Sequence, residues 1–390
     1  MKDYKNRIKI LFLSHSSNMY GAENSLLLFL QKTDKKCIEP IVAFPESGIL
    51  KDKVVDLGIR AYTIKSPWWV RCETDNIASM LYRVISEIRA LWRLSSIIRQ
   101  QNIDVVYTNT IVNFTGALAA CINKKPHIWH IREILHGNPN LYSFIPHKLL
   151  FKFILKMSQK VIVNSNATAQ QFQALNQHNK IQVVYNSVDF DQFTTSTPFP
   201  RIEGVTRQSW LVAMVASLQE RKAQDIAIRA VKIAREKIPN IKLLLIGEGF
   251  ESYTRYLKKM VLELDISKNV IFLGYRDDVM KILPYCKVLL APSQVESFGR
   301  SAIEAMAAGI PVIATNTGGL KEIVKNNNTG YLVSLGAYSQ VAGKIVELYC
   351  HPDKAEKMGE AGRKLARKMF DAERNSQDIE KIIQEVASIV

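Results

Sequence analysis

Two glutamates, Glu296 and Glu304, are separated by seven residues in a stretch that predicts a loop leading into a helix. Glu296 falls in the loop and Glu304 comes about a turn and a half into the helix, so both carboxylates can reach one crevice. Between them, the backbone N–H groups of Phe298, Gly299 and Arg300 are expected at the positive end of the helix, where the dipole stabilises a phosphate by about 0.3–1 kcal/mol per charge. Carboxylates that bind hydroxyls beside such a helix start suit a nucleotide sugar.

The elements around these glutamates are predicted to be short apolar strands that alternate with helices. Residues 287–291 predict one strand, residues 311–315 predict the next, and Ser297 is expected to cap a helix that ends at Gly309. This alternation indicates a parallel sheet covered on both faces, and such sheets bind ligands beyond the carboxyl ends of their strands. The alternative is that Glu296 only caps a helix and that the Glu304 side chain is solvated.

Three motifs in this stretch resemble the C-terminal signature of glycosyltransferase family 4. They accompany the spacing of the two glutamates and read A-P-S at Ala291–Ser293, A-A-G-I-P-V-I-A at Ala307–Ala314 and G-G-L-K-E-I-V at Gly318–Val324. The resemblance spans about residues 20–335. It implies an α/β protein of the GT-B fold, in which two Rossmann-like doubly wound parallel-sheet domains face each other across a cleft.

The resemblance also implies a set of donor-binding residues. Lys222 matches the lysine with which the family grips the donor diphosphate, but Ala216 and Ser217 stand where the family has a glycine and an arginine. Arg221 or Arg300 is a candidate replacement, because a guanidinium group binds phosphate in a bidentate manner. The predicted donor set is Gly21, Arg221, Lys222, Gly247, Gly249, Tyr275, Arg276, Phe298, Gly299, Arg300 and Glu304, with Glu304 on the ribose hydroxyls.

Two residues are predicted to act at the transferred sugar, Glu296 and His130. His130 resembles the histidine that family members carry at a strand end facing the donor sugar; its alternative is a buried histidine bonded to backbone. The loop S-H-S-S-N-M-Y-G-A-E-N resembles the glycine loop of the family, although Tyr20 replaces the first glycine. Gly21 therefore remains as the ligand contact of that loop, unless the loop is an ordinary strand-to-helix turn.

The composition fits two globular domains. A chain of 390 residues with 47% hydrophobic and 23% charged residues can form two cores. The predicted domains are an acceptor-binding domain at 1–195, a donor-binding domain at 205–374 and a helix at 375–390 that returns to the first domain. The five cysteines are scattered and lack metal-ligand spacing, which predicts reduced thiols and a cytoplasmic location. No apolar run approaches the roughly 20 residues of a membrane span.

The net charge of +16 predicts an anionic partner. Residues 1–205 carry the larger excess, with 25 Lys and Arg against 15 Asp and Glu. Segments 77–99 and 148–156 have the spacing of cationic amphipathic helices, which either pack on a sheet or lie on anionic lipid at the inner face of the cell membrane. Trp68 and Trp69 are expected in a loop, either folded into the core or in contact with lipid or sugar. The sequence has no nucleic-acid-binding motif.

The resemblance implies a retaining, metal-independent glycosyltransferase that moves a sugar from a nucleotide-sugar donor to an acceptor. The positive charge of the first domain and its two candidate amphipathic helices favour a lipid-linked or cell-surface glycan as that acceptor, in polysaccharide biosynthesis. No cofactor besides the donor is expected, and the absence of a D-x-D motif agrees with a reaction that needs no bound metal. Two alternatives stay open. One is a nucleotide-sugar isomerase of the same fold, and the other is a non-catalytic sugar-nucleotide-binding subunit of a polysaccharide assembly complex.

Overall fold

The computed structural model describes residues 7–69, 77–138, 141, 143, 145–175, 178–193 and 199–389. Its contacts divide the chain into two compact units: unit 1 is Met1–Asn186 with Ala372–Val390, and unit 2 is Ser187–Asp371. The first boundary, after Asn186, comes before the expected linker at 194–204. The second boundary, after Asp371, comes three residues before the expected end of the donor-binding domain at 374. Residues 194–198 of that linker lie outside the described residues.

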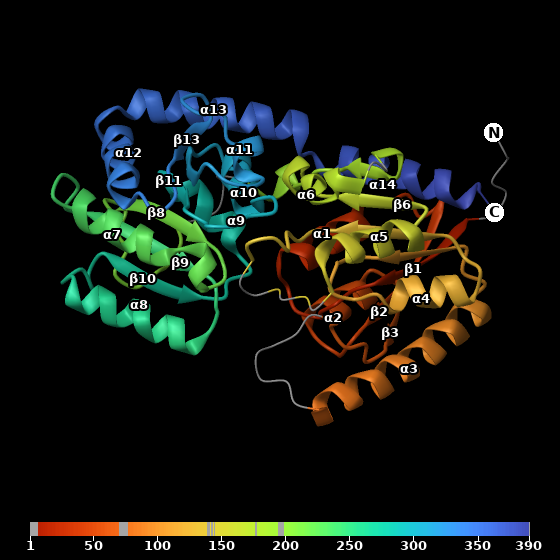
Figure 1. Cartoon of the computed structure of the whole chain (residues 1–390). Helices are drawn as coiled ribbons and strands as arrows, with labels where there is room; N and C mark the ends of the chain where they lie inside the picture. Colours follow the sequence, from red (N-terminus) through yellow and green to blue (C-terminus); the bar gives the residue numbers. More distant parts are fainter. Residues whose placement is uncertain are drawn as a thin grey trace. The chain divides into compact units, whose positions relative to one another are not determined.

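Unit 1 is built on a seven-stranded parallel sheet (Figure 1). Its strand order is β3-β2-β1-β4-β5-β6-β7. The strands are β1 (Ile8–Leu13), β2 (Ile38–Phe44), β3 (Arg60–Thr63), β4 (Val105–Thr108), β5 (His127–Ile131), β6 (Lys160–Val163) and β7 (Ile181–Val183). The apolar runs at 8–13, 38–44, 61–64, 104–108, 127–130 and 160–164 predict six of these strands to within one residue at each end. The three-residue β7 is not predicted, because so short a run gives no periodicity.

Helices cover both faces of this sheet. Alternate residues of β1 point to opposite faces: Phe12 packs in a core with α1 (Gly21–Lys32), α2 (Ile49–Asp56) and α14 (Ala372–Ala387), whereas Leu13 packs in a core with α3 (Ile77–Gln100) and α4 (Thr115–Ile122). A further core joins β5 and β6 to α5 (His147–Met157). Such two-sided burial explains why the strands are almost wholly apolar.

The helix α14 follows unit 2 in sequence but completes unit 1. Four of its apolar side chains lie in the core with α1 and α2: Ile379, Ile382, Ile383 and Val386. At its surface, Glu380 Oε1 accepts a hydrogen bond from Thr33 Oγ1 at 2.7 Å, and Glu385 Oε1 lies 2.9 Å from Lys160 Nζ. The core of unit 1 therefore depends on both ends of the chain.

Unit 2 has a six-stranded parallel sheet with the order β10-β9-β8-β11-β12-β13 (Figure 1). Its strands are β8 (Trp210–Val215), β9 (Ile241–Ile246), β10 (Val270–Gly274), β11 (Val288–Ala291), β12 (Val312–Thr315) and β13 (Gly330–Val333). The helices α7 (Gln224–Ala234), α8 (Glu251–Glu263) and α12 (Tyr338–Cys350) pack in one core, and α10 (Arg300–Ala307) contacts β11 and β12. The remaining helices are α9 (Val279–Ile282), α11 (Leu320–Ile323) and α13 (Pro352–Met369).

The two cationic segments of unit 1 differ in how they use their apolar faces. In α5 (148–156 in the sequence prediction), Leu150, Phe151, Ile154 and Leu155 are all buried, so this helix packs on the sheet. In α3, the buried residues Ala90, Leu94, Ile97 and Ile98 belong to the second half of the helix. Its first half keeps apolar side chains exposed, among them Ile85 and Ile88, and Trp92 is exposed early in the second half. Of the two predicted lipid-facing helices, only α3 retains an exposed apolar stripe.

Candidate active site

Unit 2 brings Lys222 and Glu296 together at the carboxyl edge of its sheet. Lys222 ends a short 3-10 helix after β8, Glu296 lies in the loop between β11 and α10, and their Nζ and Oε2 atoms are 2.5 Å apart. Both side chains are mostly buried, at 14% and 15% exposed. The two loops are joined by a backbone bond, in which Gln294 N–H donates to Arg221 C=O at 2.8 Å. Residues 74 positions apart thus form one ion pair.

The charges around Glu296 favour its ionised form. Burial alone would raise the pKa of Glu296, but the positive charges of Lys222 and Arg221 outweigh it and hold the pKa below its ordinary value. Ser293 Oγ also donates to Glu296 Oε2 at 3.4 Å. Glu296 is therefore an acceptor with a cation beside it, and it does not act as a helix cap.

The loop that carries Glu296 is packed against the glycines at the end of β12. Gly319 N–H donates to Glu296 C=O at 2.9 Å. Gly318 has a φ of +47°, and a Cβ at this position would overlap Glu296 C=O. Only glycine fits such a conformation and such an approach, so these glycines fix the loop that presents the Glu296 carboxylate.

The helix α10 begins at Arg300, two residues later than a cap at Ser297 would place it. Gly299 precedes it in a left-handed conformation, with a φ of +108°, which ends the loop and sets a new direction for the chain. Phe298 is buried, and its ring meets that of Phe370 edge-on with centroids 5.7 Å apart. Phe298 therefore offers a ligand its backbone and not its side chain.

Glu304 is buried in α10 and paired within the helix. Its Oε1 accepts a hydrogen bond from Arg300 Nε at 2.8 Å, and its side chain is 7% exposed. Burial raises the pKa of Glu304, and the Arg300 charge opposes this only in part. The interpretation of Glu304 as a solvated helix residue is wrong. Arg300 and Glu304 instead form a second buried pair at the start of α10.

The other predicted donor residues of unit 2 fall into two groups. A Cβ on Gly247 would overlap Ala216 C=O, and one on Gly249 would overlap Leu218 C=O, so backbone packing alone explains both glycines. Tyr275 is 43% exposed after β10, and Arg276 donates to both carboxylate oxygens of Asp278, at 2.8 and 2.6 Å. This exposed ring and the fixed guanidinium group remain available to a ligand.

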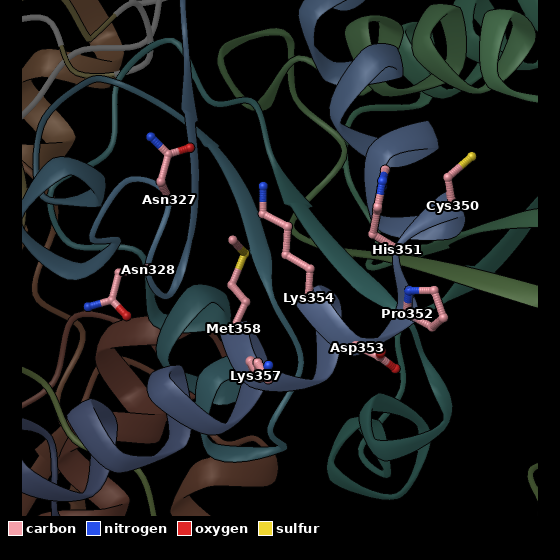
Figure 2. A pocket seen from close by; sticks show the side chains of 9 residues that line it. All are labelled: Asn327, Asn328, Cys350, His351, Pro352, Asp353, Lys354, Lys357 and Met358. Carbon is pink, nitrogen blue, oxygen red and sulfur yellow. The ribbon is translucent and has the colours of Figure 1, made fainter.

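A cavity of about 580 Å³ lies elsewhere in unit 2 (Figure 2). It is lined by the loop before β13, with Asn327 and Asn328, and by the junction of α12 and α13, with His351 and Lys354. This is the amino-terminal edge of β13, whereas Lys222 and Glu296 follow the carboxyl ends of their strands. Lys354 is also engaged with Glu347 Oε1 at 2.5 Å. The cavity is therefore separate from the candidate active site.

In unit 1, His130 near the end of β5 is buried and has two polar neighbours, Tyr107 and Arg132. Its Nδ1 lies 2.5 Å from Tyr107 Oη and 3.3 Å from Arg132 Nη2. Burial, with the Arg132 charge, lowers the pKa of His130 far below its ordinary value, which makes the ring neutral. Its Nε2 has no hydrogen-bond partner among the described residues. The bonds of His130 are to side chains, so the alternative of a backbone-bonded histidine is wrong.

Arg132 connects His130 to two asparagines, Asn109 and Asn186. Its Nε donates to Asn109 Oδ1 at 2.9 Å, and its Nη1 donates to Asn186 Oδ1. Asn109 Nδ2 in turn donates to Ala22 C=O in the first turn of α1, one residue after Gly21. In the sequence, only the position of Asn109 directly after β4 points to this site. The carboxyl ends of parallel strands lie at the same edge of a sheet, where ligands bind.

Two family matches together cover most of the chain. Residues 197–365 match the family described as glycosyl transferases group 1, and residues 19–192 match glycosyltransferase family 4. Together these two matches account for most of the chain, which belongs to the family 4 (group 1) glycosyltransferases of the GT-B type. The predicted fold class of two Rossmann-like parallel-sheet domains is confirmed, and the protein is a glycosyltransferase.

Three relatives illustrate the likeness. An N-acetyl-alpha-D-glucosaminyl L-malate synthase of Bacillus anthracis is 27% identical, over 75% of this chain and 78% of its own length. A capsular polysaccharide biosynthesis glycosyltransferase, CapM of Staphylococcus aureus, is 24% identical, over 77% and 81%. The crystal structure of Anabaena Alr3699/HepE with UDP-glucose has a TM-score of 0.81 and 23% identity, and the match covers 97% of this chain and 100% of that one.

Proposed function

We propose that this glycosyltransferase moves a sugar from a nucleoside-diphosphate sugar to a hydroxyl group of a glycan or a lipid-linked glycan. The observation that carries the proposal is the pairing of Lys222 with Glu296 at the carboxyl edge of the sheet in unit 2. A cation and a hydroxyl-binding carboxylate beside the start of α10 match a diphosphate and a sugar. The crystal structures of the fold neighbour with UDP and UDP-glucose support the same donor class.

In the proposed reaction, the acceptor oxygen forms a bond to the anomeric carbon while the bond from that carbon to the diphosphate oxygen breaks. Both events take place on one face of the sugar, so configuration is retained, and the acceptor proton passes to the departing phosphate oxygen. Lys222 stabilises the negative charge of that phosphate, with Arg221 and Arg300 as the candidate replacements for the arginine of the family. Glu304 is assigned to the ribose hydroxyls, and Glu296 and His130 Nε2 to the sugar.

Because lysine and arginine supply the positive charge, we propose that the reaction needs no metal ion. Among the residues that the structure describes, no three His, Cys, Asp or Glu side chains are grouped as a metal site requires. Turnover that persists in excess EDTA is the expected result, and loss of turnover restored by a divalent cation would contradict this part of the proposal.

Thermal melting against UDP, GDP, ADP, CMP and their common sugar conjugates tests the donor assignment. A ligand at 100 times its dissociation constant stabilises the folded protein by about 2.7 kcal/mol, which raises the melting temperature of domains of this size by several degrees. We expect one nucleotide to give such a shift. Its sugar conjugate is then expected to release that nucleotide when an acceptor is added. If no nucleotide shifts the melting of a folded sample, the donor assignment is wrong.

We further propose that α3 places unit 1 on an anionic membrane surface. Its exposed apolar residues Ile85, Ile88 and Trp92 recur at the three- and four-residue spacing of one helix face, and the exposed Arg89 and Arg93 follow them directly. An anionic lipid surface complements both the apolar stripe and the positive charge. No helix among the described residues is long and apolar enough to cross a membrane.

Vesicle binding tests this contact. Each arginine near an anionic surface contributes about 1 kcal/mol, so the double variant Arg89→Gln with Arg93→Gln is expected to bind phosphatidylglycerol vesicles about 30-fold more weakly than the wild type. Cosedimentation measures the effect, and Lys152→Gln with Lys156→Gln on α5 is the matched control. Equal binding of the wild type to phosphatidylcholine vesicles, or equal loss in both double variants, would contradict an electrostatic contact through α3.

A further inference from the structure

The positive charges of the candidate donor site in unit 2 differ in whether a carboxylate offsets them. Three cationic side chains are available to a diphosphate there: Arg221, Lys222 and Arg300. Lys222 Nζ lies 2.5 Å from Glu296 Oε2, and Arg300 Nε lies 2.8 Å from Glu304 Oε1. Each of these two cations therefore has its own carboxylate directly beside it, which offsets its charge.

Arg221 has no such carboxylate. Among the described residues, no Asp or Glu side chain forms an ion pair with Arg221, and its single side-chain hydrogen bond runs from Nε to Gln219 Oε1 at 3.0 Å. Its two Nη atoms are bonded to no described residue. A guanidinium group presents these two atoms as a fork that can bind two phosphate oxygens at once. The unused fork of the half-buried Arg221 can therefore receive an anion.

Two hydrogen bonds hold Arg221 in place. Its backbone C=O accepts from Gln294 N–H at 2.8 Å, which ties it to the loop that carries Glu296. The bond from its Nε to Gln219 uses the inner nitrogen of the guanidinium group, so it fixes the plane of the group and leaves the outer fork free. Gln219 is thus a positioning residue for the Arg221 side chain.

The charge of Arg221 acts on the ion pair of Lys222 and Glu296. Burial would raise the pKa of Glu296, but the charges of Lys222 and then Arg221 lower it. Burial lowers the pKa of Lys222, the Glu296 charge opposes this, and the Arg221 charge lowers it further. Two positive charges thus lie near one negative charge at the carboxyl edge of the sheet, so the group as a whole is positive and suits an anion.

We infer that Arg221, oriented by Gln219, supplies the uncompensated positive charge of the donor site and binds the diphosphate through its two Nη atoms. Lys222 and Arg300 act from within their pairs with glutamate. This inference deepens the proposed function, and naming the anion the donor diphosphate rests on that function. The anion site itself rests only on the contacts and charges around Arg221.

Calorimetric titration of the full chain with inorganic pyrophosphate tests the site without any choice of nucleotide. We expect the wild type to bind pyrophosphate and Arg221→Gln to bind it about 10–100-fold more weakly, the effect of losing hydrogen bonds to a charged group. Arg221→Lys keeps the charge without the fork, so its affinity is expected to lie between the two. Joint replacement of Arg300 and Glu304 by glutamine leaves the net charge unchanged and is expected to cost less affinity than Arg221→Gln.

A double-mutant cycle tests the role of Gln219. Gln219→Ala is expected to weaken pyrophosphate binding by about fivefold, the effect of one hydrogen bond. In the Arg221→Gln background it is expected to have no further effect, because Gln219 acts through Arg221. A merely structural role of Gln219 would instead give the same loss in both backgrounds. Arg229→Gln, which removes an exposed arginine of α7, is the control and is expected to bind like the wild type.

The outcomes separate this inference from the proposed function. Wild-type affinity in Arg221→Gln, a larger loss in the joint variant of Arg300 and Glu304, or no pyrophosphate binding by the wild type would overturn the inference. A nucleotide that stabilises the wild type and Arg221→Gln equally would leave the proposed function standing without it. Pyrophosphate binding that depends on Arg221, in a protein that no nucleotide stabilises, would support the anion site and overturn the proposed function instead.

Discussion

Replacement of Lys222 by alanine is expected to lower kcat/KM for glycosyl transfer by about 10²–10³-fold, the effect of removing one preorganised group that stabilises a developing charge. Lys222 is mostly buried, and its Nζ lies 2.5 Å from Glu296 Oε2, so its ammonium group is held in place before the donor arrives. The variant also leaves Glu296 without its closest cation. Initial rates with the donor identified by melting measure the loss.

Two companion variants give this prediction its controls. Lys237→Ala removes an exposed lysine of unit 2 and is expected to keep wild-type rates. The double variant Lys222→Ala with Glu296→Gln is expected to lose less than the two single losses combined, because residues in direct contact share one interaction. If Lys222→Ala transfers sugar like the wild type, Lys222 does not bind the diphosphate.

The stability of unit 1 is expected to depend on pH through Glu23. Burial raises the pKa of Glu23 to about 7 from an ordinary value of 4.5. Between these values the folded state holds a proton that the unfolded state has lost. The stabilisation is therefore complete below pH 4.5 and disappears as pH rises through about 7. A difference of this size corresponds to about 3 kcal/mol.

Glu23→Gln removes this proton linkage. Relative to the wild type, the free energy of unfolding of the variant is expected to rise by up to about 3 kcal/mol between pH 4.5 and pH 8. Burial lowers the pKa of His15, which opposes the trend, and Arg132 and Glu133 also act on this pair, so the comparison is made between variant and wild type. Four of the five tryptophans lie in residues 7–186, and urea denaturation followed by their fluorescence measures chiefly unit 1. A constant difference at both pH values would contradict the buried carboxyl.

The strands could be predicted because a strand that is buried on both faces consists almost wholly of apolar residues, and such runs are visible in the sequence. The family resemblance predicts Lys222 at the donor diphosphate and Glu296 at the sugar, but it does not predict their ion pair, since no local pattern joins residues 74 positions apart. The start of α10 was misplaced because Ser297 is a good cap by type, whereas the left-handed Gly299 decides where the helix begins.

The other differences between the sequence predictions and the structure concern which side chains are buried, and the sequence alone does not show this. Phe298 lies beside donor residues in the chain, but Phe370, which is far away in sequence, covers its ring. Glu23 reads as an ordinary acidic residue in the first turn of a helix. Only the fold shows that its carboxylate faces His15 in a buried site.

The chain path through α14 has a consequence for synthesis. The ribosome completes residues 7–186 well before it makes Ile379, Ile382, Ile383 and Val386, which fill the core of unit 1 beside α1 and α2. The part of unit 1 that is made first therefore keeps this apolar face uncovered while the whole of unit 2 is translated and can fold. The carboxyl-terminal segment acts as the closing part of the amino-terminal domain, and a chain cut after Asp371 would lose part of unit 1 while unit 2 kept every residue.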